Sequence, residues 1–138
     1  MSIEQNVRGY RKFEESVINE IKPHVREFVK HLNKKYHTSF GYKLDRRNSF
    51  DVWLTFYKKS GFFGLIKTKF GFPLLIKAYS GATDPAIVEC TKVDYSEYRQ
   101  EKESDDVDVM EFLVKLGKIL SKKFNGGRSN KRYDSYLR

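Results

Sequence analysis

Cysteine and long apolar stretches are what this sequence most clearly lacks. Cys90 is the only cysteine among the 138 residues, so no disulfide can form within the chain. No apolar run approaches the roughly 18 residues that span a bilayer. Residues 1–6 are too polar to form the core of a signal peptide. We therefore expect a cytoplasmic protein that has no membrane partner.

The common catalytic and phosphate-binding motifs are also missing. The chain contains no Walker loop, no GxGxxG, no GxSxG, no CxxC and no HExxH. Each of these motifs places backbone amides, a nucleophile or metal ligands at the spacing that its chemistry requires. Their absence favours a protein that is not an enzyme and uses no cofactor.

The composition is that of a folded chain with one hydrophobic core. Hydrophobic residues make up 39% and aromatic residues 15% of the sequence, which is too apolar for a disordered protein. A chain of 138 residues has the usual length of one domain. We expect a single domain over residues 1–127, followed by a basic, flexible tail over residues 128–138.

The charge is strongly positive and unevenly distributed. The net charge is +9, yet residues 94–111 contain eight acidic and two basic residues, a net charge of −6, so the rest of the chain carries +15. A field of that sign attracts polyanions, which include nucleic acid, an anionic membrane surface and acidic proteins. The alternative is that the lysines only keep the protein soluble.

Two long helices are predicted from apolar residues that recur every three or four positions. The first covers residues 8–37, and Pro23 inside it should kink the helix or split it in two. The second covers residues 105–124, where acidic residues at its start suit the helix dipole. The two apolar stripes are Phe13, Val17, Ile21, Val25, Phe28, Leu32 and Tyr36 in the first helix, and Val109, Leu113, Leu116, Leu120 and Phe124 in the second.

The segment between the helices is typical of antiparallel strands, because its connections are short and its residues alternate in polarity. The expected fold is therefore α+β, an antiparallel sheet of four or five strands flanked by a long kinked N-terminal helix and a C-terminal helix. If both helices cover one face, the other face is open to solvent, a ligand or a second copy. The expected strands are 40–44, 49–57, 62–70, 74–79 and 86–93, with a turn at 58–61, a break at 71–73 and a loop over 80–85.

Aromatic residues and lysines occur together in the predicted strands, and residues 61–80 contain three lysines and no acidic residue. Aromatic rings stack on bases while lysines follow phosphates, so this mixture favours binding of single-stranded nucleic acid, either DNA or RNA. The alternative is that the rings belong to the core and the lysines protect a sheet edge. The candidate contact residues are Trp53, Tyr57, Lys67, Lys69, Lys77 and Tyr79 in the sheet and Arg128, Lys131 and Arg132 in the tail.

Two other kinds of binding protein fit the same sequence. One is a protein-interaction module, an inhibitor or regulator of the type that phages and mobile elements carry, which acts on a host or cellular protein and could be a homodimer. The other is a curved sheet that encloses a small ligand in an apolar pocket lined by Phe and Tyr.

Two further features are better explained by structure than by chemistry. Glu20, His24, Glu27 and His31 share one flank of the first helix at a spacing that could bind a metal. However, Pro23 disturbs that flank, and a solvated polar surface explains the pattern, so no metal site is predicted. Cys90 falls late in a strand and is expected to be a small core residue.

Overall fold

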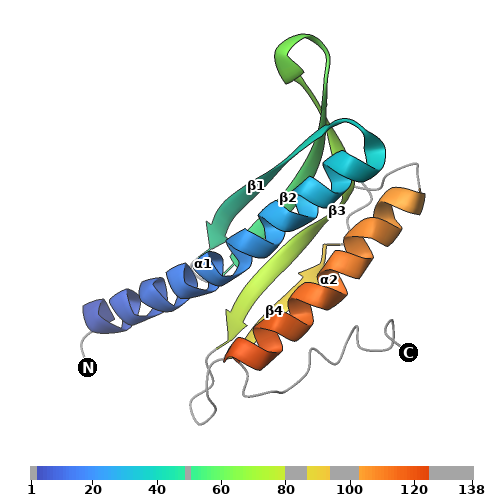
Figure 1. Cartoon of the computed structure of the whole chain (residues 1–138). Coiled ribbons are helices and arrows are strands. Elements are labelled where there is room, and N and C mark those ends of the chain that lie inside the picture. The colour runs from blue at the N-terminus through green and yellow to red at the C-terminus, as the bar shows by residue number, and fades with distance from the viewer. Residues whose placement is uncertain (1–2, 49–50, 80–86, 94–102, 125–138) are drawn as a thin grey trace.

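The computed structural model describes residues 3–48, 51–79, 87–93 and 103–124. Their order is helix, four strands and helix, which confirms the predicted α+β class (Figure 1). The elements are α1 (Ile3–Tyr36), β1 (Ser39–Asn48), β2 (Asp51–Ser60), the short 3₁₀ helix η1 (Phe62–Gly64), β3 (Ile66–Tyr79), β4 (Ile87–Lys92) and α2 (Glu103–Phe124).

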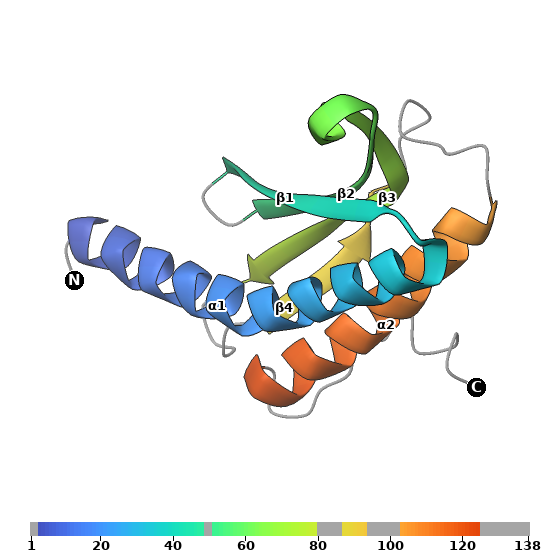
Figure 2. The same ribbon diagram turned by 45° about the horizontal axis from the view of Figure 1, so that its top comes forward.

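The four strands form one antiparallel sheet in the order β1-β2-β3-β4. Figure 2 shows two layers, with α1 and α2 side by side on one face of this sheet. The opposite face is called the open face below, and neither α1 nor α2 covers it. No helix in the described ranges is long and apolar enough to cross a membrane.

The apolar stripes of both helices pack into the core as predicted, except that the side chain of Phe13 lies outside the described residues. Val17, Ile21, Val25 and Leu32 of α1 and Val109, Leu113, Leu116 and Leu120 of α2 are buried. Phe28 joins the layers: its ring stacks on Phe112 of α2 at 4.4 Å and meets the edge of Phe56 of β2 at 5.0 Å. Cys90 is completely buried in β4, which confirms its prediction as a core residue.

Pro23 does not divide the first helix. α1 continues from Ile3 to Tyr36, and Figures 1 and 2 show its axis bending near the middle, where Pro23 lies. The missing N–H of Pro23 removes one backbone hydrogen bond. Burial of the apolar stripe on both sides of Pro23 stabilises the helix enough to offset that loss. The helix ends at Tyr36, and the next residue, His37, has a left-handed φ of 54°. The Phe40 amide then donates to Asn33 Oδ1 at 2.7 Å.

The sequence interpretation was wrong at residues 71–73, where a break between two strands was expected. β3 is one strand of 14 residues that passes through this segment. Its pairing with β2 shifts there, since Leu54 pairs with Leu74 but Phe56 pairs with Phe70. Gly71 has a φ of 68°, and the shift leaves Pro73 in an irregular position where its missing N–H breaks no regular ladder.

The turn of the β2–β3 hairpin also lies later than predicted. Residues 58–60 are the end of β2, and the chain reverses over residues 61–65 through η1. The sheet consequently has four strands, with β3 continuous from the hairpin turn to Tyr79.

Candidate functional site

The strand register places the predicted sheet residues on one face. Residues that pair across neighbouring strands point to the same side of the sheet, and every second residue of a strand shares that side. The inward positions are Val52, Leu54 and Phe56, so the odd-numbered residues of β2 and their partners lie on the open face, although Thr55, at the register shift with β3, is buried. The cross-strand rows of the open face are Asp51, Lys77 and Glu89; then Asp45, Trp53, Leu75 and Thr91; then Gly41, Tyr57 and Lys69; and finally Ser39, Lys59 and Lys67.

The open face therefore carries Trp53, Tyr57, Lys67, Lys69 and Lys77 together, but it does not carry them as one cluster. Trp53 and Tyr57 are four residues apart on β2, a distance of about 13 Å along the strand. The structure brings Tyr57, Lys67 and Lys69 together near the hairpin and leaves Trp53 and Lys77 in the other half.

The two halves differ in charge. Lys77 pairs with Asp51 on one side and with Glu89 on the other, so opposite charges surround it. Near the hairpin, Lys59 pairs directly with Lys67, and Lys69 follows two residues later on β3. Like charges directly opposite each other repel. An anion bound at this end of the sheet would reduce the repulsion between the lysines.

A hollow of about 530 Å³ opens at this basic end, along the edge of β1. Lys59 reaches over Gly41 to line it: a Cβ atom at Gly41 would lie only 2.7 Å from Lys59 Cε. The ring of Tyr57 is half-buried beside the two residues. The full lining is Val29, Phe40, Gly41, Tyr42, Lys43, Tyr57, Lys59 and Lys67, which includes no carboxylate.

This β1-edge hollow suits an anionic group attached to a flat ring. Three lysines contribute positive charge, and Tyr57 contributes an aromatic surface within the same lining. Lys43 is partly neutralised by Asp45, whose Oδ1 lies 3.6 Å from its Nζ, whereas Lys59 and Lys67 face each other. Because lysines also line it, the hollow differs from the apolar pocket of Phe and Tyr that a small hydrophobic ligand would need.

The remaining predicted contact residues lie in the tail and at the end of β3. Arg128, Lys131 and Arg132 lie outside the described residues, as does the tail that contains them. Tyr79 ends β3, where its backbone pairs with Ile87. Lys43 and Lys59 are the residues that the sequence reasoning missed, because only the register of β1 against β2 reveals that they share the open face.

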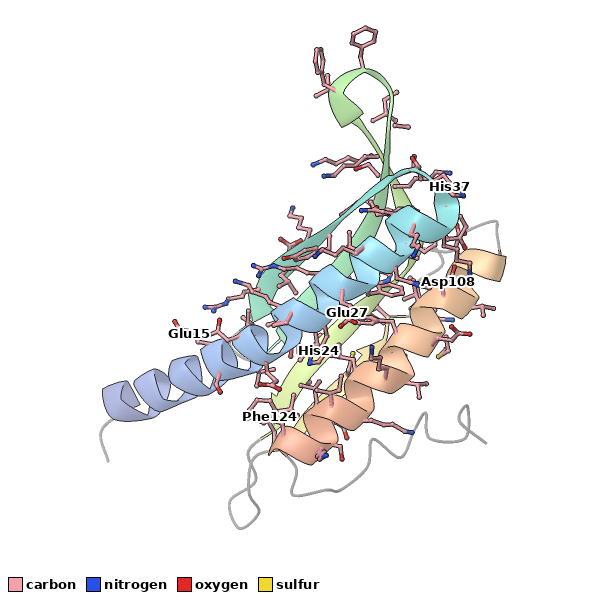
Figure 3. All side chains as sticks on the ribbon, in the orientation of Figure 1. Glu15, His24, Glu27, His37, Asp108 and Phe124 are labelled. Carbon is pink, nitrogen blue, oxygen red and sulfur yellow. The ribbon has the colours of Figure 1, made fainter. Side chains whose placement is uncertain are left out.

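The side chains of Glu20, His24, Glu27 and His31 on α1 do not converge into a set of metal ligands. Figure 3 labels His24 and Glu27 on α1, and within the described ranges no three His, Cys, Asp or Glu side chains come together as ligands. Glu27 and His31 are exposed on the helix surface.

One buried polar contact was not foreseen. Asp108 near the start of α2 is buried and accepts hydrogen bonds from Lys35 Nζ at 2.7 Å and from the Tyr36 hydroxyl. Figure 3 shows Asp108 on the turn of α2 that lies beside the end of α1. Burial and this hydrogen bond both raise the pKa of Tyr36, and the hydrogen bond with Asp108 raises the pKa of Lys35. This contact joins the two helices and lies on the helix side of the sheet.

No protein family matches the chain, and neither curated proteins nor solved structures include one that is significantly similar to it. The open face is therefore the part of the molecule from which a function can be inferred.

Proposed function

We propose that this protein binds single-stranded nucleic acid, without catalysis, at the basic end of its open face. The observation that carries the proposal is the opposed pair Lys59 and Lys67 beside Tyr57, in a hollow whose lining contains no carboxylate. A phosphate placed between the two ammonium groups removes their mutual repulsion. A base attached to that phosphate can stack on the ring of Tyr57.

The geometry supports a smaller contact surface than the sequence suggested. Lys43, Lys59, Lys67 and Lys69 surround Tyr57, so a strand of a few nucleotides would cross β1, β2 and β3 at this point. Trp53 extends the path toward the other half of the face, where Asp51 and Glu89 reduce the attraction for phosphate. The tail residues remain predicted additional contacts.

The test is fluorescence anisotropy with a short labelled oligonucleotide over a range of salt concentrations. Replacing Lys59, Lys67 and Lys69 by Gln should reduce the salt slope by about 2, since each phosphate neutralised on a single strand contributes roughly 0.7. The matched control replaces Lys115, Lys118 and Lys122, which are exposed on α2, and removes the same charge. The control should keep the wild-type slope.

Substitutions of Tyr57 distinguish the contribution of stacking to binding from the contribution of charge. Tyr57→Ala should weaken binding by about 1–3 kcal/mol, while Tyr57→Phe retains the ring and should bind nearly as the wild type does. Gly41→Val offers a further test, because the new side chain would displace Lys59 and fill the hollow without entering the core.

Two results would contradict the proposal. One is the absence of oligonucleotide binding at low salt. The other is an equal loss of affinity in the open-face and α2 variants, which would indicate an effect of net charge alone. A protein partner that survives nuclease treatment, found together with no affinity for oligonucleotides, would support the protein-interaction alternative.

A further inference from the structure

The turn of the β2–β3 hairpin concentrates exposed apolar side chains. This hairpin tip, residues 61–66, projects beyond the rest of the fold in Figure 1, and Figure 3 shows its side chains pointing away from the body. Phe62 is 84% and Phe63 is 90% exposed, and Leu65 and Ile66 are exposed beside them. Among the described residues, the one other exposed large apolar side chain is Val107 on α2. Contacts among the described residues do not explain such a concentration.

The backbone of the tip is built to hold these side chains in solvent. Gly61 and Gly64 have left-handed φ angles of 77° and 66°, and the Gly64 amide donates to the Gly61 carbonyl at 3.3 Å. Phe63 between them also has a left-handed φ, of 56°, which is uncommon for a bulky residue. Residues with strain of this kind are held by the surrounding structure and cluster at functional sites.

Lysines surround the tip on both faces of the hairpin. Lys59 and Lys67 form a cross-strand pair on the open face, and Lys69 lies in the next row. Lys58 pairs with Thr68 and alternates to the opposite face. These four residues, the lysine collar, lie one to three residues behind Ile66, or about 3–10 Å along the strands. Residues 52–83 contain no acidic residue.

We infer that the hairpin tip inserts into the surface of an anionic lipid bilayer, with the lysine collar against the lipid phosphates. Segments that bind at the bilayer interface bury their apolar side chains to a depth of about 5–10 Å. Insertion to that depth would place the collar at the level of the headgroups. There lysines gain attraction from anionic lipid, while the apolar tip enters the acyl boundary.

A bilayer is favoured over a protein partner by the shape and the charge of this feature. The tip is a narrow, convex projection, so a protein would need a matching apolar pocket, whereas the bilayer interface accepts such a projection directly. The expectation that membranes are not a partner depended on the absence of a spanning segment, and interfacial binding requires none. Nucleic acid on the open face would share Lys59, Lys67 and Lys69 with the lipid but would not need the phenylalanines.

The experiment is co-sedimentation of the full chain with vesicles of phosphatidylcholine, with and without phosphatidylserine. The chain should bind the phosphatidylserine vesicles, and Phe62→Ser with Phe63→Ser should lower the partition coefficient at least about tenfold. The matched control Val107→Ser removes an exposed apolar side chain elsewhere and should bind as the wild type does. Lys67→Gln should lower binding roughly fivefold.

A second readout tests insertion itself. Phe63→Trp, in a Trp53→Phe background, should shift its emission to shorter wavelengths on the vesicles and be quenched by brominated lipid. The double serine variant should keep its thermal midpoint and its oligonucleotide affinity, so failure of this inference is distinguishable from failure of the proposed function.

Three outcomes would overturn the inference. They are no binding to phosphatidylserine vesicles, equal binding by the double serine variant, and self-association through the tip with no vesicle binding. The last outcome, seen by light scattering as an oligomer that the double serine variant loses, would identify a second copy as the occupant.

Discussion

Gly71→Ala should be among the most damaging small substitutions in this chain. Gly71 lies in the irregular part of β3 and has a φ of 68°, which costs a residue with a Cβ about 1–2 kcal/mol. A Cβ atom there would also lie 2.3 Å from Val109 Cγ2 and 3.2 Å from the Asp105 carbonyl oxygen. Val109 is completely buried, so the first turns of α2 must move, at a cost of about 1–3 kcal/mol. The expected loss is about 2–5 kcal/mol of unfolding free energy.

The assay is urea denaturation followed by circular dichroism and by Trp53 fluorescence. Gly64→Ala is the matched control, because Gly64 has a φ of 66° but its nearest neighbour, Lys59 Cβ, lies 3.6 Å away. The control should lose only the backbone share, about 1–2 kcal/mol. Val109→Ala combined with Gly71→Ala should cost less than the two single losses together. If Gly71→Ala is no more damaging than Gly64→Ala, α2 does not pack against this part of β3.

Four further predictions concern the folded body. Asp108→Ala leaves the Tyr36 hydroxyl without its acceptor and should cost about 1.5–3 kcal/mol in thermal or chemical unfolding. The pKa values of Tyr36 and Lys35 are both raised, so their stabilisation is complete below about pH 10 and lost as the pH rises through the folded values. Tyr36→Phe should therefore reduce the slope of unfolding free energy above pH 10, measured by urea titration at each pH, and an unchanged slope would contradict this account. Burial raises the pKa of the Cys90 thiol, so Ellman's reagent should modify it only when urea unfolds the chain. His37→Gly should stabilise the protein by up to about 1 kcal/mol, because glycine accepts the left-handed φ after α1.

The sequence predicted the helices and their buried faces well, because periodicity is a local property. Val17, Ile21 and Val25 recur at the spacing of a helix face, and they are buried. The break expected at residues 71–73 was wrong for a tertiary reason. A glycine and a proline so close together usually mark a turn, but here they form an irregularity in β3 that makes room for Val109 of α2.

The hairpin turn was misplaced for a related reason. Lys58, Lys59 and Ser60 have the polarity of a turn, and the apolar residues after them have the composition of a strand. The structure has the reverse order, because the apolar residues form the exposed tip.

Trp53 and Tyr57 lie on one side of the sheet, as alternation along a strand requires of two residues four positions apart. It could not divide that face into a charge-balanced half and a basic half, because the division depends on which residues pair across strands. The contact between Asp108 and Tyr36 spans 72 residues of sequence and was also missed. A signal was present, since Asp108 comes four residues before Phe112, on the face of the helix that is buried.

Binding of nucleic acid at the open face is tested most directly by a nuclear magnetic resonance titration. The ¹⁵N-labelled protein is titrated with a single-stranded oligonucleotide at low salt. The largest amide shifts should occur at Gly41, Tyr57, Lys59, Lys67 and Lys69 and should diminish as salt is added. Shifts confined to the helix surfaces of α1 and α2, or no shifts at all, would contradict the assignment of the open face as the binding site.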